Sequence, residues 1–423
     1  MSDTVPASLA PLTGLFLGAG ASYELGMPLV WGLTNELKTW LTPDKLRDLN
    51  TSWREQGGGY PDTVIDDLSR ILEQYNEMHY ESILGYLETQ FLRSQQHQEQ
   101  AQAYHGLYSW LVEMVYYLLY FRHVKNESFI ASGLRYVEGI AGLALQNTPL
   151  WVFSLNHDLM IECLAIQYGL TLNSGFSGTM TLPRRDRDGM KIGDLHAEII
   201  SGEEVEKLGM PFLQPGSLGI NLLKIHGALD VFTFRDGKDL MKLQPLAANV
   251  GGVLNSLRAA NEELLYIHPT VPTRPIKATN EIAYADDEGE MQFLRRSLLS
   301  GAYKFNQRFS QVLPSVFLKC FRSNINYLST VVSIGYGFGD IHINAVLREW
   351  LEASTGRALV IVGPGTTSVP SVLLHLAPQV TMINGTATDY LEQYVLRPLT
   401  PAEIAEKARR LDAVNHTGTS RSR

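Results

Sequence analysis

Short, mainly apolar segments that end in polar or glycine-rich turns are the most regular pattern along the chain. Such segments, several of them rich in β-branched or aromatic side chains, are typical of strands buried on both faces of a parallel sheet. Together they predict an α/β protein with a Rossmann-like parallel sheet. The predicted strands are Leu15–Leu17, Leu150–Leu155, Leu222–Ile225, Leu328–Ile334, Ala358–Val362 and Val380–Ile383.

A helical pattern fills the long segment between the first two predicted strands. Apolar side chains recur there at spacings of three and four residues, as at Ile65, Leu68, Ile71 and Leu72. This period predicts four or five helices and no strand. We interpret 32–146 as an all-helical insertion in the sheet, and we expect further helices over 160–168 and 343–353.

The remaining parts of the chain carry no long regular period. We interpret 173–220 and 236–324 as insertions of loops, short strands and helices, with one helix predicted from Met291 to Phe309. A C-terminal helix and tail are expected over 396–423. The parallel core is then assembled from four stretches, which are 10–31, 147–172, 221–235 and 325–395.

Composition and charge restrict the partners. Of 423 residues, 45% are hydrophobic and 19% are charged, a balance typical of a globular protein. A net charge of −9 argues against an extended nucleic-acid surface, which needs many Lys and Arg side chains. We interpret the densest basic run, Arg184, Arg185 and Arg187, as a solvated loop. We therefore expect no direct contact with nucleic acid.

Targeting signals and cysteines limit the location of the protein and the metal sites that it could form. The longest apolar stretch, 110–121, contains Glu113 and is shorter than the roughly 20 residues of a membrane span. The N-terminus shows no signal-peptide pattern, so we expect a cytoplasmic protein without membrane contact. The two cysteines, Cys163 and Cys320, cannot supply a four-thiolate zinc site.

Four of the predicted strands end in residues that could carry chemistry. Because ligands of open α/β sheets bind outside the carboxyl ends of the strands, these residues are expected to gather there. Glycine turns can bring backbone N–H groups close to a pyrophosphate, and a histidine is suited to act as a general base near neutral pH. The four groups are Gly18-Ala19-Gly20-Ala21-Ser22, Asn156-His157-Asp158, His226 and Gly335–Asp340.

Each group also has a purely structural interpretation. The first glycines could form a tight turn needed only for packing, and Asn156 and Asp158 could cap the next helix. His226 could be a hydrogen-bonded structural residue, and His157 is expected to point into packing. The order and the strand-end placement of the groups favour the functional interpretation.

The motifs resemble those of sirtuins. Gly18-Ala19-Gly20-Ala21-Ser22 with Gly26-Met27-Pro28, Asn156-His157-Asp158 and Lys224-Ile225-His226-Gly227 are similar to sirtuin segments and occur in the same order. The run from Gly335 to Asp340, followed by His342-Ile343-Asn344, resembles the form found in sirtuin-like prokaryotic defence proteins. The chain lacks the zinc-ribbon cysteines of deacylating sirtuins, and Leu29-Val30-Trp31 stands where those enzymes carry Phe-Arg.

The resemblance implies an NAD⁺ hydrolase that releases nicotinamide and ADP-ribose, linear or cyclic, as the NAD-depleting effector of an anti-phage system. It implies that His226 is the base, that Asn156 positions the ribose and water, and that Asp158 orients this network. No cofactor beyond NAD⁺ as substrate and no zinc are expected. The other implied NAD⁺-binding residues are Gly18, Ala19, Gly20 and Ser22 at the pyrophosphate, Gly335, Gly337, Phe338 and Asp340 on the adenosine side, and Asn384 at the adenosine ribose.

Alternatives of other classes are a sirtuin-type deacylase or ADP-ribosyltransferase, and a non-catalytic NAD or ADP-ribose-binding regulatory subunit. An unrestrained NAD⁺ hydrolase would kill its host, so we expect its activity to be controlled by homo-oligomerisation, by a partner defence protein, or by both. The expected partner is an ATPase, an Argonaute-like protein or a nucleotide-processing enzyme. We expect the helical insertion to supply the contact surface, unless its apolar residues only pack internally. The residues concerned are Tyr116, Tyr117, Tyr120, Phe121, Ile83, Leu84 and Leu87.

Overall fold

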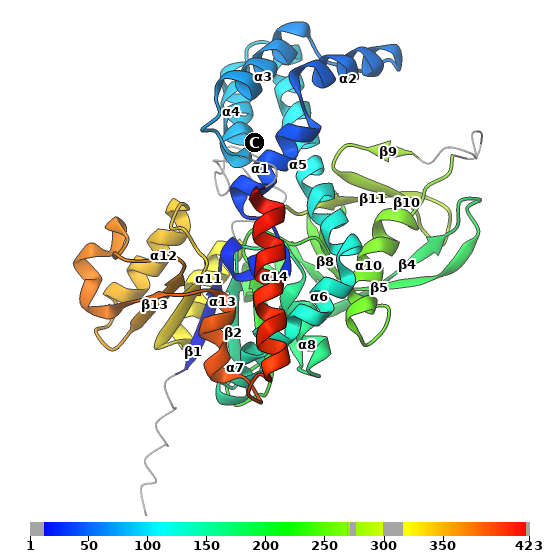
Figure 1. Cartoon of the computed structure of the whole chain (residues 1–423). Helices are drawn as coiled ribbons and strands as arrows, with labels where there is room; N and C mark the ends of the chain where they lie inside the picture. Colours follow the sequence, from blue (N-terminus) through cyan, green and yellow to red (C-terminus); the bar gives the residue numbers. More distant parts are fainter. Residues whose placement is uncertain (1–11, 269, 271–275, 299–315, 420–423) are drawn as a thin grey trace, which may run out of the picture.

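A seven-stranded parallel sheet, here sheet A, forms the centre of the protein. The computed structural model describes residues 12–268, 270, 276–298 and 316–419 (Figure 1). The strand order is β14-β13-β12-β1-β2-β6-β3, and every pair is parallel. The strands are β1 (Thr13–Leu17), β2 (Leu150–Ser154), β3 (Leu172–Asn173), β6 (Ile220–Lys224), β12 (Thr330–Ile334), β13 (Ala358–Gly363) and β14 (Val380–Asn384).

This order confirms the predicted α/β class and all six predicted strands. The two-residue β3 was missed, because a strand so short carries no period. The chain moves outward from β1 in one direction through β2 and β6, and from β12 in the other direction through β13 and β14. The point where this direction reverses lies between β1 and β12, and such a switch point opens a crevice at the strand ends.

The helical insertion contains more helices than its period predicted. Several short turns divide it; α2, for example, begins at the Thr42 cap with Pro43 in its first turn. In Figure 1 the first helices project beyond the two sheets, and the long α5 runs back to them. The helices are α1 (Val30–Trp40), α2 (Pro43–Glu55), α3 (Asp62–Gln74), α4 (Tyr80–Arg93), α5 (Gln98–Lys125), α6 (Glu127–Gly133), η2 (Leu134–Val137) and α7 (Gly139–Gln146).

The apolar residues expected to form a contact surface are mostly in the core, so that basis for assembly is wrong. Tyr116 and Tyr120 are buried, as are Ile83, Leu84 and Leu87, whereas Phe121 is exposed. The Tyr116 hydroxyl donates to the Leu229 carbonyl at 3.0 Å, and the Tyr120 hydroxyl donates to Glu262 at 2.6 Å. These side chains join α5 to the rest of the molecule.

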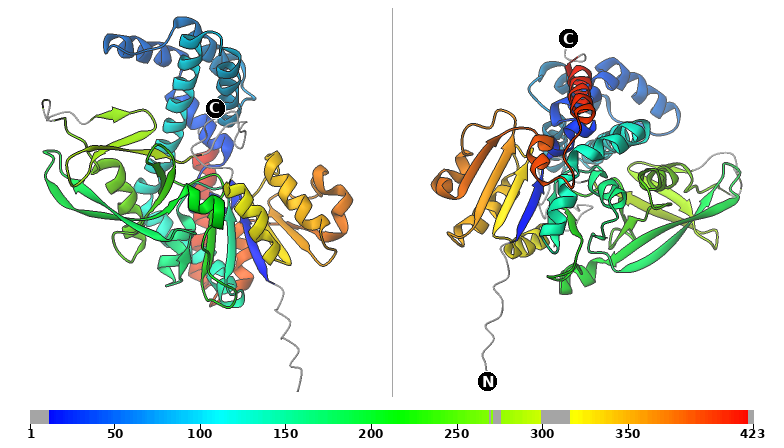
Figure 2. Two further views of the ribbon diagram at one scale, coloured as in Figure 1. Left: turned by 180° about the vertical axis from the view of Figure 1, so that it is seen from behind. Right: turned by 60° about the horizontal axis from the view of Figure 1, so that its bottom comes forward.

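A second, antiparallel sheet, here sheet B, occupies the segments expected to be mainly loops and helices. Its order is β4-β5-β8-β7-β11-β10-β9, and α10 (Val250–Glu262) contributes to the hydrophobic core on one face. Sheet B lies to one side of sheet A (Figure 2). The strands are β4 (Gly178–Arg185), β5 (Lys191–Ser201), β7 (Val231–Phe234), β8 (Asp239–Leu243), β9 (Lys277–Ala278), β10 (Glu281–Ala285) and β11 (Met291–Arg296).

Two sequence predictions are corrected by sheet B. The helix expected from Met291 to Phe309 begins instead as the strand β11, and 299–309 lie outside the described residues. Met291 and Phe293 are exposed while Leu294 is buried, so apolar character does not follow the two-residue alternation of a strand. Pairing with β10 and β7 decides the conformation. The stretch 221–235, expected in the parallel core, divides between β6 and β7.

Arg296 at the end of β11 fastens sheet B to α5. The side chain is 2% exposed, and its guanidinium donates to Glu113 at 3.1 Å and to the Tyr117 hydroxyl at 2.9 Å. It also lies over the rings of Tyr116 and Tyr117, 4.7 and 4.9 Å from their centroids. Burial of a guanidinium is tolerated because it is paired and hydrogen-bonded.

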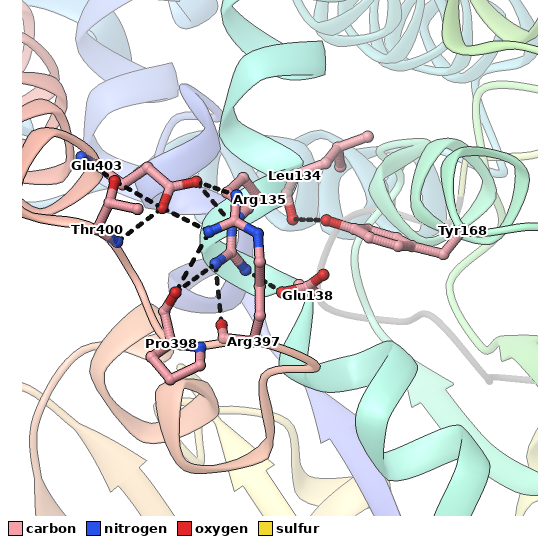
Figure 3. Close-up of polar contacts among 8 residues, drawn as sticks. All are labelled: Leu134, Arg135, Glu138, Tyr168, Arg397, Pro398, Thr400 and Glu403. Atoms are coloured by element: carbon pink, nitrogen blue, oxygen red, sulfur yellow. Dashed lines mark hydrogen bonds and ion pairs between the residues drawn. The ribbon is translucent and has the colours of Figure 1, made fainter.

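The C-terminal helix α14 (Pro401–Thr419) is held along much of its length. Near its start, Glu403 accepts from Arg397 at 2.6 Å and from Arg135 at 2.9 Å (Figure 3). Farther along, Arg410 donates to the Phe129 carbonyl at 2.6 Å, and Asn415 accepts from the Tyr23 hydroxyl at 3.0 Å. The helix therefore straps the insertion to η1 (Ala19–Leu25), which follows β1.

Glu403→Gln is expected to loosen α14. Hydrogen bonds from Arg397, then from the Thr400 N–H and Arg135, hold the pKa of Glu403 below its ordinary value of 4.5. Because the folded pKa is the lower one, this stabilisation is present above about pH 4.5 and is lost as the pH falls further. The protection of the amides over 401–415 against hydrogen exchange, relative to an unstructured chain at the same pH, should fall in the variant at neutral pH. In the parent protein this protection should fall only in acid.

Glu406→Gln is the matched control, because Glu406 lies on the same helix and its ion pair, with Arg409 at 2.7 Å, stays within that helix. Equal exchange rates in the two variants would show that Glu403 does not anchor α14.

Candidate active site

Two glycine turns meet at the switch point between β1 and β12. A side chain at Gly18 would place its Cβ 2.6 Å from the Gly335 carbonyl oxygen, and one at Gly20 would lie 2.7 Å from the Gly335 Cα. Gly335 has φ +67°, and a Cβ there would lie 2.4 Å from the Gly20 Cα. The Gly20 N–H donates to the Gly335 carbonyl at 3.0 Å. Packing therefore requires these glycines, as one of the two sequence interpretations stated.

Asn156, directly after β2, reaches the β1 turn. Its side-chain amide donates to the Gly18 carbonyl at 2.9 Å and to the Ser22 hydroxyl at 3.1 Å. These two contacts orient the amide, with its carbonyl oxygen on the opposite side of the group. The structure thus brings Asn156, Gly18 and Ser22 together, and Asn156 does not cap the following helix.

Asp158 is buried at the start of the next turn. Its carboxylate accepts from the Met160 N–H at 3.1 Å, at the beginning of α8 (Met160–Gln167). The backbone carbonyl of Asp158 accepts from the Lys224 ammonium. His157 lies between, with Nδ1 3.2 Å from the Gly227 carbonyl. The capping interpretation therefore holds in part for Asp158, and His157 points toward the loop after β6.

Two buried lysines and two buried carboxylates lie directly behind this turn. Lys242 donates to Glu162 at 2.9 Å and to Asp230 at 2.5 Å, and Lys224 lies 3.5 Å from Glu162. Burial alone would raise the pKa of Glu162, but the two ammonium groups outweigh it and hold that pKa below its ordinary value. Burial raises the pKa of Asp230, and its pairing with Lys242 opposes this only in part.

This charge network was missed at the sequence level, although a signal existed. Glu162, Lys224 and Lys242 are each a single charge inside an apolar segment, and a buried charge needs a partner. The sequence did not show which charges would pair, because the partners lie on different elements.

His226 follows β6 and is 4% exposed. Its Nε2 lies 3.3 Å from a carboxylate oxygen of Asp340, which comes from the loop after β12. In sheet order β1 and β2 separate β12 from β6. The β12 loop therefore crosses the ends of two strands to bring Asp340 against the histidine.

The β12 loop is held in a strained form by its own side chains. Phe338 has φ +56°, its carbonyl accepts from Asn344 at 2.8 Å, and its ring packs on Tyr336 at 4.7 Å. The Tyr336 hydroxyl accepts from the Asp340 N–H at 3.2 Å. Non-glycine residues at positive φ persist only where their surroundings fix them, and they cluster at functional sites.

Asn384 lies apart from the other predicted site residues. It ends β14 at the edge of sheet A, three strands from β1, and its side-chain oxygen accepts from the Gly365 N–H at 2.8 Å. Gly337 carries no packing constraint, since nothing lies within 4 Å of the Cβ it would bear.

A small cavity adjoins these turns. Its polar lining is Ser22, Ser154, Asn156 and Asp158, and apolar side chains of β1, β12, η1, η2, α7, α8 and α13 (Ala387–Leu391) form the remainder. An apolar cavity with a few convergent polar groups is typical of a small-molecule site.

The described part of the chain contains neither a metal-binding cluster nor a helix that could span a membrane. Within the described ranges, no three His, Cys, Asp or Glu side chains are grouped so as to hold a metal ion. Across those ranges, too, every helix is either too short or too polar to span a bilayer.

Comparisons with known proteins give structural similarities. No protein-family model and no curated protein sequence matches the chain. A solved structure described as "Structural Basis for the Mechanism and Regulation of Sir2 Enzymes" matches with 12% identity and a TM-score of 0.34, covering 95% of this chain and 94% of that one. Similarity at this level adds nothing to the argument for activity, which depends on the strand-end residues.

Gly335→Ala is expected to lower the free energy of unfolding by about 2 kcal/mol or more, because a Cβ at positive φ would also collide with the Gly20 backbone. Gly337→Ala, two residues away in open space, should change it by less than about 0.5 kcal/mol. Urea unfolding of both variants measures the difference, and comparable losses would mean that the contact between the turns is not tight.

Proposed function

We propose that this protein hydrolyses NAD⁺ at the bond between nicotinamide and ribose, giving nicotinamide and ADP-ribose. The observation that supports this most directly is the cavity beside Asn156, Asp158 and Ser22. It lies at the carboxyl ends of the strands of sheet A, where the His226–Asp340 pair also lies. The cavity lining supplies an amide, a hydroxyl and a carboxylate, and the imidazole of His226 follows the neighbouring strand β6. The motif resemblance to sirtuins supplies the substrate class.

The cavity suits a flat aromatic amide. Its walls are largely apolar, as a pyridine ring requires, and its polar groups are hydrogen-bonding side chains rather than a cluster of like charges. The Asp158 carboxylate can accept from a carboxamide N–H.

The reaction asks for little acid catalysis. Nicotinamide leaves as a neutral base because its ring nitrogen is cationic in NAD⁺, unlike the leaving group of an ordinary glycoside, which must be protonated. The protein has to place water and stabilise positive charge on the ribose. In this proposal His226 accepts a proton from a ribose hydroxyl, and Asn156 orients the ribose and the attacking water.

The remaining groups would hold the rest of the dinucleotide. Because the N–H groups of Gly18, Gly20 and Ala21 already donate to backbone carbonyls, the pyrophosphate falls to the Ala19 N–H and to the Ser22 hydroxyl. Gly335, Gly337 and Phe338 would line the adenosine side. Asn384, at the sheet edge, would bind the adenosine ribose only if the dinucleotide extends across β13.

We further propose a role in anti-phage defence by depletion of NAD⁺ in the cytoplasm, with activity restrained by self-association or by a partner such as an ATPase, an Argonaute-like protein or a nucleotide-processing enzyme. A deacylase or ADP-ribosyltransferase is the alternative with an acceptor substrate. Incubation with and without an acylated peptide separates them, since only a transferase would make an acylated or peptide-bound ADP-ribose product.

His226→Ala and Asn156→Ala should each reduce nicotinamide release by roughly 10²-fold or more, because each removes a group that acts on the reacting ribose. Release is measured by chromatography with NAD⁺ in excess. The matched controls are His196→Ala on β5 and Asn255→Ala on α10, both exposed, which should retain parental rates. Near-parental activity of folded His226→Ala and Asn156→Ala would refute the assignment.

Chelation should leave the rate unchanged, because this chemistry uses protein side chains and water only. A strong chelator is added to the parent protein and nicotinamide release is followed against an untreated sample. A loss of activity that zinc restores would contradict the metal-free mechanism.

A further inference from the structure

We infer that Asp340 is a positioning residue for His226: it fixes which ring nitrogen carries the proton, rather than binding adenosine. The inference rests on the proposed function, in which His226 is the base. Its basis is the 3.3 Å separation between Asp340 Oδ2 and His226 Nε2. The two side chains are 12% and 5% exposed, so water screens their interaction only weakly.

The two oxygens of the Asp340 carboxylate have different tasks. Oδ1 caps α12 (Ile341–Glu352), accepting from the His342 N–H at 3.0 Å and the Ile343 N–H at 3.3 Å. Oδ2 faces His226. Because the helix N-terminus fixes one oxygen, the direction of the other is set as well.

The backbone of Asp340 is fixed too. Its N–H donates to the Tyr336 hydroxyl at 3.2 Å, and that hydroxyl lies 2.8 Å from the side-chain oxygen of Asn344. Asn344 in turn donates to the Phe338 carbonyl at 2.8 Å. Asp340 is therefore fixed at its backbone and at its side chain.

The 3.3 Å contact between Nε2 and Oδ2 is an ion-pair distance. Because an ionised carboxylate only accepts hydrogen bonds, we infer that the nitrogen that faces it, Nε2, carries the proton. In the neutral ring the lone pair is then on Nδ1, which makes Nδ1 the atom that accepts the proton of the ribose hydroxyl. The positive charge that develops on the ring is stabilised by the nearby carboxylate. The proton moves from oxygen to Nδ1, and Asp340 stays ionised throughout.

Asp340→Asn separates this role from the capping role. Asparagine is as good an N-cap as aspartate, so its oxygen can keep the bonds to α12 while its NH₂ group faces His226. An NH₂ group donates, so Nε2 must become the acceptor and the proton must move to Nδ1. Histidine ¹⁵N labelling and long-range ¹⁵N–¹H NMR, with the His226 signal assigned from His226→Gln, distinguish the two tautomers.

We expect an Nε2–H tautomer in the parent protein and an Nδ1–H tautomer in Asp340→Asn. The control is Asp44→Asn, which removes an exposed carboxylate from the first turn of α2, in the helical insertion, and should leave the His226 signal unchanged. Tyr336→Phe is a second variant that keeps the carboxylate but releases its backbone; it should give a mixture of tautomers. An unchanged His226 tautomer in folded Asp340→Asn would overturn the inference.

The kinetic signature is also specific. Asp340→Asn should lower kcat by roughly 10²- to 10⁴-fold and change KM for NAD⁺ by less than about threefold, since the loss concerns the base. A raised KM with unchanged kcat would instead assign Asp340 to adenosine binding and reject the inference. If the tautomer switches in Asp340→Asn but the parent protein does not cleave NAD⁺, the proposed function is rejected while the Asp340–His226 pairing is supported.

Discussion

The buried pairing of Glu162 and Asp230 with Lys224 and Lys242 is the interaction on which the arrangement of the site depends. Each of these ions costs several kcal/mol to remove from water, and only mutual pairing offsets this. The four residues come from α8, the β6–β7 connection, β6 and β8, so they are satisfied only when sheet A and sheet B meet in one register. Removing one partner of such a group costs about 3–5 kcal/mol because a charge is left buried alone.

This register determines where the functional side chains lie. Lys224 is two residues before His226, and its ammonium also binds the Asp158 carbonyl, two residues after Asn156. The ends of β2 and β6 are therefore tied together from behind, and the side chains that follow them are presented on the same side. At the switch point itself, the close contact of Gly20 with Gly335 plays the equivalent part for β1 and β12.

Much of the fold could be predicted because sheet A has a local signal. Each of its long strands is an apolar run followed by a polar turn, so Leu150–Leu155 and Leu222–Ile225 are identified without knowledge of their neighbours. Sheet B has no such signal. Met291 and Phe293 in β11 are exposed apolar residues, and their pattern resembles that of a helix until pairing with β10 and β7 is known.

The candidate site was predictable residue by residue but not pair by pair. Asn156 and His226 stand at strand ends, which the sequence shows. The contact of His226 with Asp340 joins residues 114 positions apart. It depends on the loop that Phe338 and Asn344 bend across β1 and β2. A motif places Asp340 near a ligand, whereas only the folded loop shows that it faces an imidazole.

The helical insertion is joined to the same strand ends, which gives assembly a physical route to the site. His123 on α5 is buried, and its Nε2 accepts from the Leu159 N–H at 3.1 Å, so Nδ1 carries the proton and donates to the Leu119 carbonyl at 2.8 Å. Burial lowers the pKa of His123, which keeps the ring neutral and this tautomer in place. The Tyr116 hydroxyl, two turns earlier on α5, donates to the Leu229 carbonyl after β6.

One helix therefore makes a hydrogen bond to the segment after Asn156 and another to the segment after His226. On the loop side, the donor in the first bond and the acceptor in the second are backbone groups, so displacement of α5 would move the loops themselves rather than single side chains. Coupling of this kind needs an element with two arrangements that both sites bias. Under the proposed function, in which activity is restrained by self-association or by a partner, α5 is the element through which binding at the insertion would act on Asn156 and His226 together.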